Sequence, residues 1–369
     1  MYKSIETLLV EIPTIRPHKM AVATMQTQTL VLIKIVTEDG FTGWGEATTI
    51  GGLGYGDESP ESVKTNIETY FAPLLKSLSG LNFAQTIQTI KRNINGNRFA
   101  KCAIQTALLD IQAQRLDLPL SEILGGRLRD SVPVLWVLAS GNTEKDIAEA
   151  KKMIELKRHN VFKLKIGSRP VEDDVAHVLA IKQALGSEIS IRVDVNRAWS
   201  ELEAIKGIQA LQDGGVDLIE QPCAIENLDA MQRLTRRFDI AIMADESLNG
   251  PHSAYQIARN NGASVFAVKV AQSGGLIEGC EVGKIAKLAG IDLYGGTMLE
   301  GPVGTIASAH VFSTFDHLAY GTELFGPLLL TEEILKTPLQ YQNYELVLPT
   351  VSGLGIELDL NKIDNLRRQ

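Results

Sequence analysis

Charged and polar residues end six strand-like segments in the second part of the chain. These segments are otherwise apolar, and a buried strand rarely carries an unpaired charge, because desolvating one costs on the order of several kcal/mol. The residues concerned are Lys163 and Lys165, Asp194 with Asn196, Glu220, Asp245, Lys269 and Glu323. Carboxylates and three lysines gathered at one end of a set of strands favour chemistry on an anion.

Three of the carboxylates have the spacing of a metal site. Asp194, Glu220 and Asp245 come from consecutive strands, so we expect them to be neighbours. Three carboxylates at close range repel one another strongly unless a cation lies among them. All-oxygen ligation selects a hard divalent ion, Mg²⁺ or Mn²⁺. A zinc site is less favoured, because no histidine lies beside these carboxylates in the sequence. The alternative is a set of separate carboxylate–lysine ion pairs without a metal.

The lysines indicate proton transfer. Lys163 and Lys165 share one face of a strand because side chains alternate along it. A nearby dication and Lys163 both disfavour the protonated form of Lys165, as a general acid/base requires. Lys269 comes four strands later, so it faces Lys165 across a closed barrel. This arrangement predicts proton transfer at an α-carbon through a metal-stabilised enolate, with Glu323 as a hydrogen-bond partner, a proton donor or the partner of a lysine.

The elements that must position these residues are a series of strand–helix units. The charges at 163, 194, 220, 245 and 269 recur every 24 to 31 residues, which is one βα unit per step. Eight such strands close into a TIM-type barrel. We predict strands at Val134–Leu138, Val161–Ile166, Ile189–Val195, Leu218–Glu220, Ile240–Ala244, Val265–Val270, Ile291–Tyr294 and Leu318–Gly321.

The remaining segments are predicted to form a second unit. A hairpin is expected between Thr29–Val36 and Phe41–Thr48, and Ser59-Pro60 opens a helix. Strands at Tyr344–Leu348 and Gly355–Leu358 are expected to return to this unit. The predicted domains are an α+β unit at 1–126, a barrel at 127–325 and a returning segment at 326–369. Further helix signals are the capping boxes Thr143-x-x-Asp146 and Ser200-x-x-Glu203 and the terminating residues Gly186, Gly214, Gly262 and Gly290.

Composition excludes several classes of function. The chain has 369 residues, and its net charge of −8 argues against nucleic acid or an anionic membrane as partner. No apolar run approaches the length of a membrane span, and the first residues do not resemble a signal peptide. Three scattered cysteines, Cys102, Cys223 and Cys280, suit a reducing compartment. We therefore expect a cytoplasmic protein with a small-molecule substrate.

Two N-terminal stretches carry weaker signals. The glycine-rich run 51–56 lacks the Gly-Lys-Ser/Thr of a phosphate loop, so a loop that covers a substrate is favoured over nucleotide binding, with a plain surface loop as the alternative. His18 and Lys19 could hold a distal carboxylate, but we expect them at the surface.

Together these residues resemble the enolase superfamily, in its muconate-lactonising subgroup. The resemblance covers essentially the whole chain and shows no departure at an acid/base or metal position. It is carried by Lys-x-Lys at 163–165, Asp-x-Asn at 194–196, Glu-Gln-Pro at 220–222, Asp-Glu-Ser at 245–247 and Lys269 with Gly274-Gly275, and by the stretches 13–19, 45–52, 294–301 and 321–327.

The resemblance implies a fold, an activity and residue roles. The fold is a modified (β/α)₇β TIM barrel with an α+β N-terminal capping domain that the C-terminal tail completes. The activity is interconversion of cis,cis-muconate, a small dicarboxylate, and (+)-muconolactone in catechol breakdown through the β-ketoadipate pathway, with Mn²⁺ in a homo-octamer. Lys165 would be the acid/base and Glu323 the proton donor, with electrostatic support from Lys163 and Lys269. The implied substrate contacts are Ile50, Tyr55 and Asn196.

Four alternatives stay open at this point. Racemisation needs a base on each face of the carbon, and Lys165 and Lys269 could supply both, so the lysines alone do not separate it from lactonisation. The same barrel could therefore be a racemase or epimerase of N-acylated amino acids or dipeptides, or an o-succinylbenzoate synthase. It could also act on chlorinated muconates, or be a binding or scaffolding protein without catalysis.

Overall fold

The N-terminal part of the molecule is built on an antiparallel sheet. The computed structural model describes residues 2–20, 24–78, 80 and 82–368. The sheet has the order β1-β2-β3 and consists of β1 (Tyr2–Lys19), β2 (Thr24–Thr37) and β3 (Thr42–Thr48). Gly40 turns the chain between β2 and β3 at φ +93°, a conformation that glycine adopts without strain. The predicted hairpin is confirmed, although β1 was not foreseen.

Helix α4 (Arg98–Leu116) packs closely on β3. A Cβ atom added at Gly43 would lie 2.1 Å from the carbonyl oxygen of Ala107, and one added at Gly45 would lie 1.8 Å from that of Ala103. Only glycine permits this approach of helix to sheet. The other helices of this part are α1 (Pro60–Asn66), the π-helical turn η1 (Ile67–Phe71), α2 (Ala72–Ser77), α3 (Phe83–Asn93) and α5 (Leu120–Ile123).

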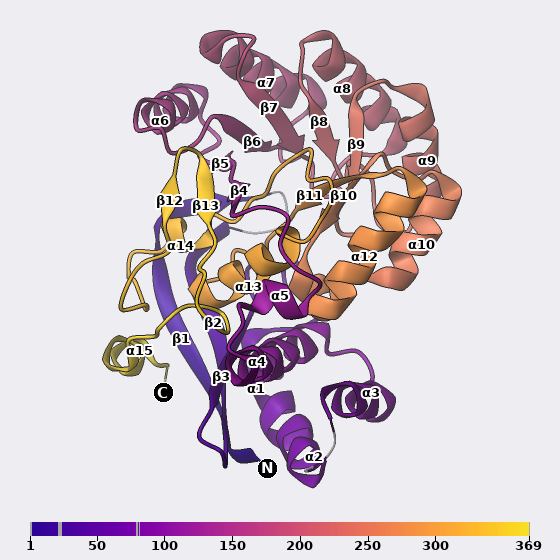
Figure 1. Ribbon diagram of the computed structural model, residues 1–369. Coiled ribbons are helices and arrows are strands. Elements are labelled where there is room, and N and C mark those ends of the chain that lie inside the picture. Colours follow the sequence, from indigo (N-terminus) through magenta and orange to yellow (C-terminus); the bar gives the residue numbers. More distant parts are fainter. Residues whose placement is uncertain (1, 21–23, 79, 81, 369) are drawn as a thin grey trace.

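Seven parallel strands form a curled sheet in sequential order, surrounded by helices (Figure 1). The strands are β5 (Trp136–Leu138), β6 (Val161–Lys165), β7 (Ser190–Asp194), β8 (Leu218–Glu220), β9 (Ala241–Ala244), β10 (Val265–Val268) and β11 (Asp292–Gly295). The helices between and after them are α6 (Thr143–Glu155), α7 (Val171–Leu185), α8 (Glu201–Asp213), α9 (Leu228–Arg237), α10 (Pro251–Asn260), α11 (Val270–Ser273), α12 (Leu276–Ala289) and α13 (Pro302–Phe312). The predicted α/β barrel is confirmed.

The eighth position of the barrel differs from its prediction. The residues before Gly321 form a turn, in which the Gly321 N–H donates to the Leu318 carbonyl. The extended residue comes after it: Thr322 makes parallel bridges to Val134 on one side and Gly295 on the other. The sheet therefore closes through Thr322 rather than through a strand at Leu318–Gly321, whose apolar residues are used in the turn.

Helix starts follow the expected capping chemistry with one exception. Ser200 forms the predicted capping box, and Ser59 is the N-cap of its helix as predicted, where it also forms a capping box with Ser62. Helix α6, however, is capped by the side chain of Asn142, which accepts from the Lys145 N–H. Thr143 is already the first helical residue, so the predicted capping box there is wrong by one position.

The C-terminal residues join the two parts of the molecule. β12 (Tyr341–Gln342) and β13 (Glu345–Val347) form a small sheet with β4 (Ser131–Pro133), in the order β12-β13-β4. Helix α14 (Gly326–Leu329) precedes this sheet. After the sheet the tail, with α15 (Leu360–Leu366), runs back to β1, where the Arg368 N–H donates to the Leu9 carbonyl. The predicted strand at Gly355–Leu358 is reduced to one bridge between Leu358 and Leu335. Among the described residues, no helix has the length and apolar character needed to cross a membrane.

Candidate active site

The predicted charged residues meet at the carboxyl ends of the barrel strands. Lys165 pairs with Asp194 in the β6–β7 register, and Asp194 pairs with Glu220 in the β7–β8 register. Asp245 directly follows β9, Lys269 directly follows β10, and Glu323 directly follows the closing residue Thr322. Parallel strands end at the same rim, which is where barrel enzymes hold their reactive groups. The sequence spacing thus becomes a single cluster.

Strand alternation decides which side chains enter the barrel. On β6, Lys163 is buried at the centre of the charged cluster, whereas Phe162 and Leu164 are fully buried in the apolar core. Asp194 and Val193 repeat this alternation on β7. Burial of whole apolar faces on the opposite side anchors the strands, so the charged side chains are held on a rigid frame.

Asp194, Glu220 and Asp245 form a triangle suited to a metal ion. Each offers one carboxylate oxygen, and these oxygens lie within 4.8 Å of one another. Glu220 Oε1 and Asp245 Oδ1 are buried and accept no hydrogen bond from any described residue. Burial, then the charge of Asp194, raises the pKa of Glu220 well above its ordinary value. Hard oxygen donors with free lone pairs and excess negative charge fit a divalent cation such as Mn²⁺ or Mg²⁺.

Lys163 lies between carboxylates at the base of the cluster. Its Nζ is 2.7 Å from Glu220 Oε2 and 3.8 Å from Asp194 Oδ2, and it also donates to Glu323. Burial works against its charge, but Glu220 and Glu323 outweigh it and hold the pKa of Lys163 well above the ordinary range. Lys163 is therefore a fixed positive charge at neutral pH.

Lys165 and Lys269 each contact one corner of the carboxylate triangle. Lys165 Nζ is 2.5 Å from Asp194 Oδ2, and Lys269 Nζ is 2.7 Å from Asp245 Oδ2. Burial opposes ionisation of Asp194, yet Lys165 and then Lys163 lower its pKa below the ordinary value. For Lys269, burial is likewise outweighed by Asp245, so its pKa is raised. In strand order the two lysines stand on opposite sides of the barrel.

Two of the three predicted substrate contacts, Tyr55 and Asn196, form hydrogen bonds with residues of the cluster, whereas the third, Ile50, is an apolar buried residue. Tyr55, from the glycine-rich run, donates its hydroxyl hydrogen to Asp245 Oδ2 at 2.7 Å and accepts from Lys269 at 2.5 Å. Asn196 is buried next to the triangle, where its N–H donates to Asp194 and its Nδ2 donates to Glu246. Ile50 is buried in the core.

Two residues of the cluster, Tyr294 and Glu246, were given no role from the sequence, and a third, His18, was considered as a carboxylate contact but expected at the surface. Tyr294 donates its hydroxyl hydrogen to Glu323. Glu246 is buried beside Asp245, and burial, then the charge of Asp245, raises its pKa to about 8. His18 is only 1% exposed, so its predicted surface position is wrong, whereas Lys19 is exposed as expected.

His18 belongs to the surroundings of the lysines. Burial, followed by the charge of Lys165, lowers its pKa well below the ordinary value, so the imidazole is neutral. Its Nδ1 is buried and has no hydrogen-bond partner among the described residues. The only sequence signal was the position of His18 in the stretch 13–19; its burial depends on packing between β1 and the barrel rim.

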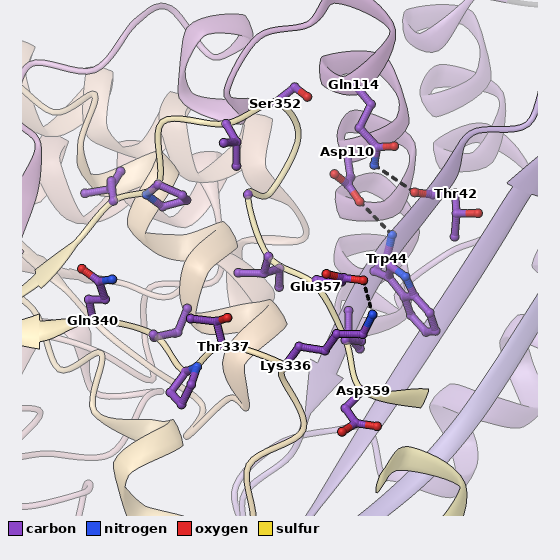
Figure 2. Close-up of a pocket in the computed structure, with 18 of the residues that line it drawn as sticks. Thr42, Trp44, Asp110, Gln114, Lys336, Thr337, Gln340, Ser352, Glu357 and Asp359 are labelled. Carbon is purple, nitrogen blue, oxygen red and sulfur yellow. Dashed lines mark hydrogen bonds and ion pairs between the residues drawn. The ribbon is translucent and has the colours of Figure 1, made fainter. Parts of the chain in front are cut away.

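A hollow of considerable size lies away from this cluster. It has a volume of about 1170 Å³ and separates β3 and α4 from the C-terminal tail (Figure 2). Its described lining residues include none of the predicted site residues. Asp110, the buried acid there, accepts hydrogen bonds from the backbone N–H groups of Trp44 and Leu354. A smaller hollow of about 420 Å³ lies on the barrel rim at Asn196 and Arg197.

Family models cover nearly the whole chain. Residues 4–125 match the mandelate racemase / muconate lactonizing enzyme N-terminal domain, and residues 145–362 match the enolase C-terminal domain-like family.

Individual relatives agree with these models over the full length. Muconate cycloisomerase 1 of Acinetobacter baylyi is 76% identical over 369 residues, covering 100% of both chains. Muconate cycloisomerase 1 of Pseudomonas putida is 52% identical over 371 residues, covering 100% of this chain and 99% of that one. A muconate lactonizing enzyme of Pseudomonas fluorescens complexed with muconolactone superposes with a TM-score of 0.97 at 53% identity, covering 100% of this chain and 99% of that one. The chain belongs to the mandelate racemase and muconate lactonizing enzyme family of the enolase superfamily.

Proposed function

We propose that the protein is a cycloisomerase that interconverts cis,cis-muconate and muconolactone. The observation that carries the proposal is the 76% identity with a muconate cycloisomerase over the whole of both chains. Chlorinated muconates are less favoured as substrates, because the chloromuconate cycloisomerase of Cupriavidus necator is only 41% identical to this chain, against 76% for the muconate cycloisomerase of Acinetobacter baylyi. The racemase, o-succinylbenzoate synthase and scaffolding alternatives are not favoured by these relatives.

The cluster supports specific roles for its own residues. In the lactonising direction one substrate carboxylate forms a C–O bond to the diene, and the displaced electron pair moves toward the other carboxylate. Lys165 then delivers its proton to the α-carbon of that second carboxylate. In the reverse direction Lys165 takes the proton back. Lys163 and Lys269, both held positive, stabilise the growing negative charge without moving a proton.

Asp194, Glu220 and Asp245 are proposed to hold Mn²⁺, with Mg²⁺ as the alternative. When bound, the cation would supply positive charge that stabilises the carboxylate on which negative charge develops. Support comes from two carboxylate oxygens of this triangle, Glu220 Oε1 and Asp245 Oδ1, which are buried and have no hydrogen-bond partner in the described part of the chain.

Glu323 is proposed as the partner of Lys163 and Tyr294, because it accepts hydrogen bonds from both. Its role as proton donor stays a prediction. Tyr55, Asn196 and Ile50 are proposed to bind substrate. The buried neutral His18 adds a ring nitrogen near Lys165 that has no hydrogen-bond partner among residues 2–20, 24–78, 80 and 82–368. Assembly as a homo-octamer, a cytoplasmic location and a place in catechol breakdown remain proposals, as does the division at 1–126, 127–325 and 326–369.

The test is turnover with defined metals. Protein stripped with a chelator and reloaded with Mn²⁺ or Mg²⁺ should consume cis,cis-muconate, measured by its ultraviolet absorbance. Parallel assays would measure consumption of a chlorinated muconate and exchange of the α-proton of N-acylated amino acids. Lys165→Met should abolish turnover, whereas Lys206→Met, an exposed lysine on α8, should not change it. Failure of both metal forms to consume muconate would contradict the proposal.

A further inference from the structure

Two side chains of the N-terminal sheet form hydrogen bonds to a loop of the barrel, and the mechanism above uses neither the side chains nor the loop. The side chains are those of Gln28 on β2, which is 1% exposed, and Thr48 on β3, which is fully buried. The loop follows β11 and consists of residues 296–301. Polar side chains buried at the boundary between sheet and barrel are costly unless they make specific hydrogen bonds.

The side chains of Gln28 and Thr48 donate hydrogen bonds to backbone carbonyl oxygens of this loop. Gln28 Nε2 donates to the carbonyl oxygens of Met298 at 3.2 Å and Leu299 at 2.8 Å. The Thr48 hydroxyl donates to the Met298 carbonyl at 3.3 Å. The loop therefore accepts three hydrogen bonds from two side chains on neighbouring strands of the N-terminal sheet, two from Gln28 and one from Thr48.

The loop needs such support because its conformation is strained. Leu299 has φ +57°, in the left-handed region that a leucine adopts rarely. Residues held in this region persist only where their surroundings determine them, and they concentrate at functional sites. Within the loop, Glu300 accepts from the Met298 N–H, which holds the turn from the inside.

The strained loop bears directly on Lys269. A Cβ atom added at Gly296 would lie 2.7 Å from Lys269 Cγ, so the loop backbone forms one wall of the channel in which the lysine runs. The Gly296 N–H donates to the Val268 carbonyl, immediately before Lys269. A shift of this wall would therefore move the lysine stem, and with it the ammonium group that contacts Asp245.

We infer that Gln28 and Thr48 are positioning residues for Lys269, acting through the segment 296–299. The inference rests on the proposed cycloisomerase activity and adds to it that the N-terminal sheet sets the place of a charge inside the barrel. A purely structural role would instead make Gln28 one of several polar ties between the two parts.

The chain offers a matched control for that structural role. Gln105 on α4 is also buried, and it also ties the N-terminal part to the barrel. Its Nε2 donates to Glu278, and its Oε1 accepts from the Ile277 N–H, both on α12. Among the described residues Gln105 donates to or accepts from none of the loop residues 296–301, so Gln105→Met removes a hydrogen-bonded contact of the same chemistry without loosening the wall beside Lys269.

The experiment compares Gln28→Met and Gln105→Met in the metal-loaded enzyme with cis,cis-muconate. We expect Gln28→Met to lower kcat at least tenfold with KM within twofold of wild type. Gln105→Met should lower the melting temperature but leave kcat within twofold. Thr48→Val, which is nearly the same size as threonine, should lower kcat about threefold and serves if Gln28→Met does not fold. A crystal structure of the Gln28 or Thr48 variant should show Lys269 Nζ displaced from Asp245 Oδ2.

Equal kcat values for the Gln28, Thr48 and Gln105 variants and wild type would overturn the inference, as would an unmoved Lys269. A wild-type enzyme that does not consume muconate is a different result: it overturns the proposed function and, with it, the basis of the inference.

Discussion

Lys163 is the residue on which the charge balance of the cluster depends. Its ammonium group touches Glu220 and Glu323 and lies near Asp194, and all four side chains are at most 5% exposed. A buried ion pair is weak evidence for stability as a pair, but removing one partner leaves an uncompensated buried charge.

Replacing this lysine should destabilise the fold as well as stop catalysis. We expect Lys163→Met to lower the free energy of unfolding by about 3 kcal/mol, because it leaves Glu220 and Glu323 without their cation. Urea unfolding of metal-free protein measures this. Lys206→Met is the matched control, since that lysine is exposed on α8. A Lys163→Met variant as stable as the control would show that the carboxylates take up protons or water at little cost.

The carboxylate triangle makes a separate prediction about metal binding. At a Mn²⁺ concentration about a hundred times the Kd, the wild type should gain about 2.7 kcal/mol of stability, because the ion binds only the folded chain. Glu220→Gln should lose most of this gain, since it removes one anionic ligand. Melting curves with and without Mn²⁺ measure it, with Glu226→Gln on the exposed rim as control. An unchanged gain in Glu220→Gln would place the ion elsewhere.

At the scale of elements, the site was predictable because its charges interrupt apolar strands. Lys163, Asp194 and Glu220 stand out locally, and the strand order then brings them together. The places of His18 and Tyr294 in the cluster were missed, although both residues lie in stretches, 13–19 and 294–301, that carry the family resemblance. Their place in the cluster comes from contacts between β1, the barrel rim and Glu323, which no local pattern encodes.

The same distinction explains the fold. Alternation of β-branched runs and helices predicted the strands of the barrel, because each run is long enough to be read locally. The prediction of the eighth strand was wrong because two adjacent segments, Leu318–Gly321 and Thr322, could each occupy that position in the barrel. The turn at Gly321 and the neighbours Val134 and Gly295 decide it. Likewise, Asn142 rather than Thr143 caps α6. Either side chain could accept a backbone hydrogen bond there, and the path of the chain places Asn142 at the N-cap position.

The packing of α4 on β3 is testable by a single methyl group. We expect Gly45→Ala to lower the free energy of unfolding by about 3 kcal/mol, because its Cβ would meet the Ala103 carbonyl at 1.8 Å and force helix and sheet apart. Gly56→Ala is the matched control: a Cβ there would make only ordinary contacts, at 3.7 Å and 3.8 Å from the Phe99 ring, and Gly56 does not have a positive φ. Chemical denaturation measures both. Equal stabilities would mean that α4 can move away from the sheet without cost.

At the scale of the whole molecule, the N-terminal sheet and the barrel share a buried acid. Glu46 on β3 accepts hydrogen bonds from the N–H groups of Gly301 and Gly304, at the start of α13. This is a helix N-terminus capped by a side chain from another part of the fold. Burial, reinforced by nearby Glu300, raises the pKa of Glu46 to about 8, although the α13 N–H groups oppose the shift.

Because Glu46 binds a proton in the folded state, the stability of the boundary between the N-terminal sheet and the barrel depends on pH. The folded state binds the proton of Glu46 more tightly than the unfolded chain, in which the pKa is 4.5. The contribution of Glu46 to stability is therefore complete below about pH 4.5 and is lost as the pH rises through 8. Glu46→Gln removes the titration but keeps a side chain of the same shape. The stability of wild type relative to this variant should fall between pH 5 and pH 9, by on the order of 4 kcal/mol.

Urea unfolding of both proteins across that range measures the difference directly, since every other titrating group is common to the two. Glu300 is the group to watch: it is buried near Glu46 and its pKa is also raised by burial. If the stability of the wild type falls with pH relative to Glu300→Gln but not relative to Glu46→Gln, the proton resides on Glu300 in the barrel loop. A difference that stays constant from pH 5 to pH 9 would mean that the α13 N–H groups hold Glu46 ionised throughout, and that the two parts of the molecule are joined by a charge rather than by a proton.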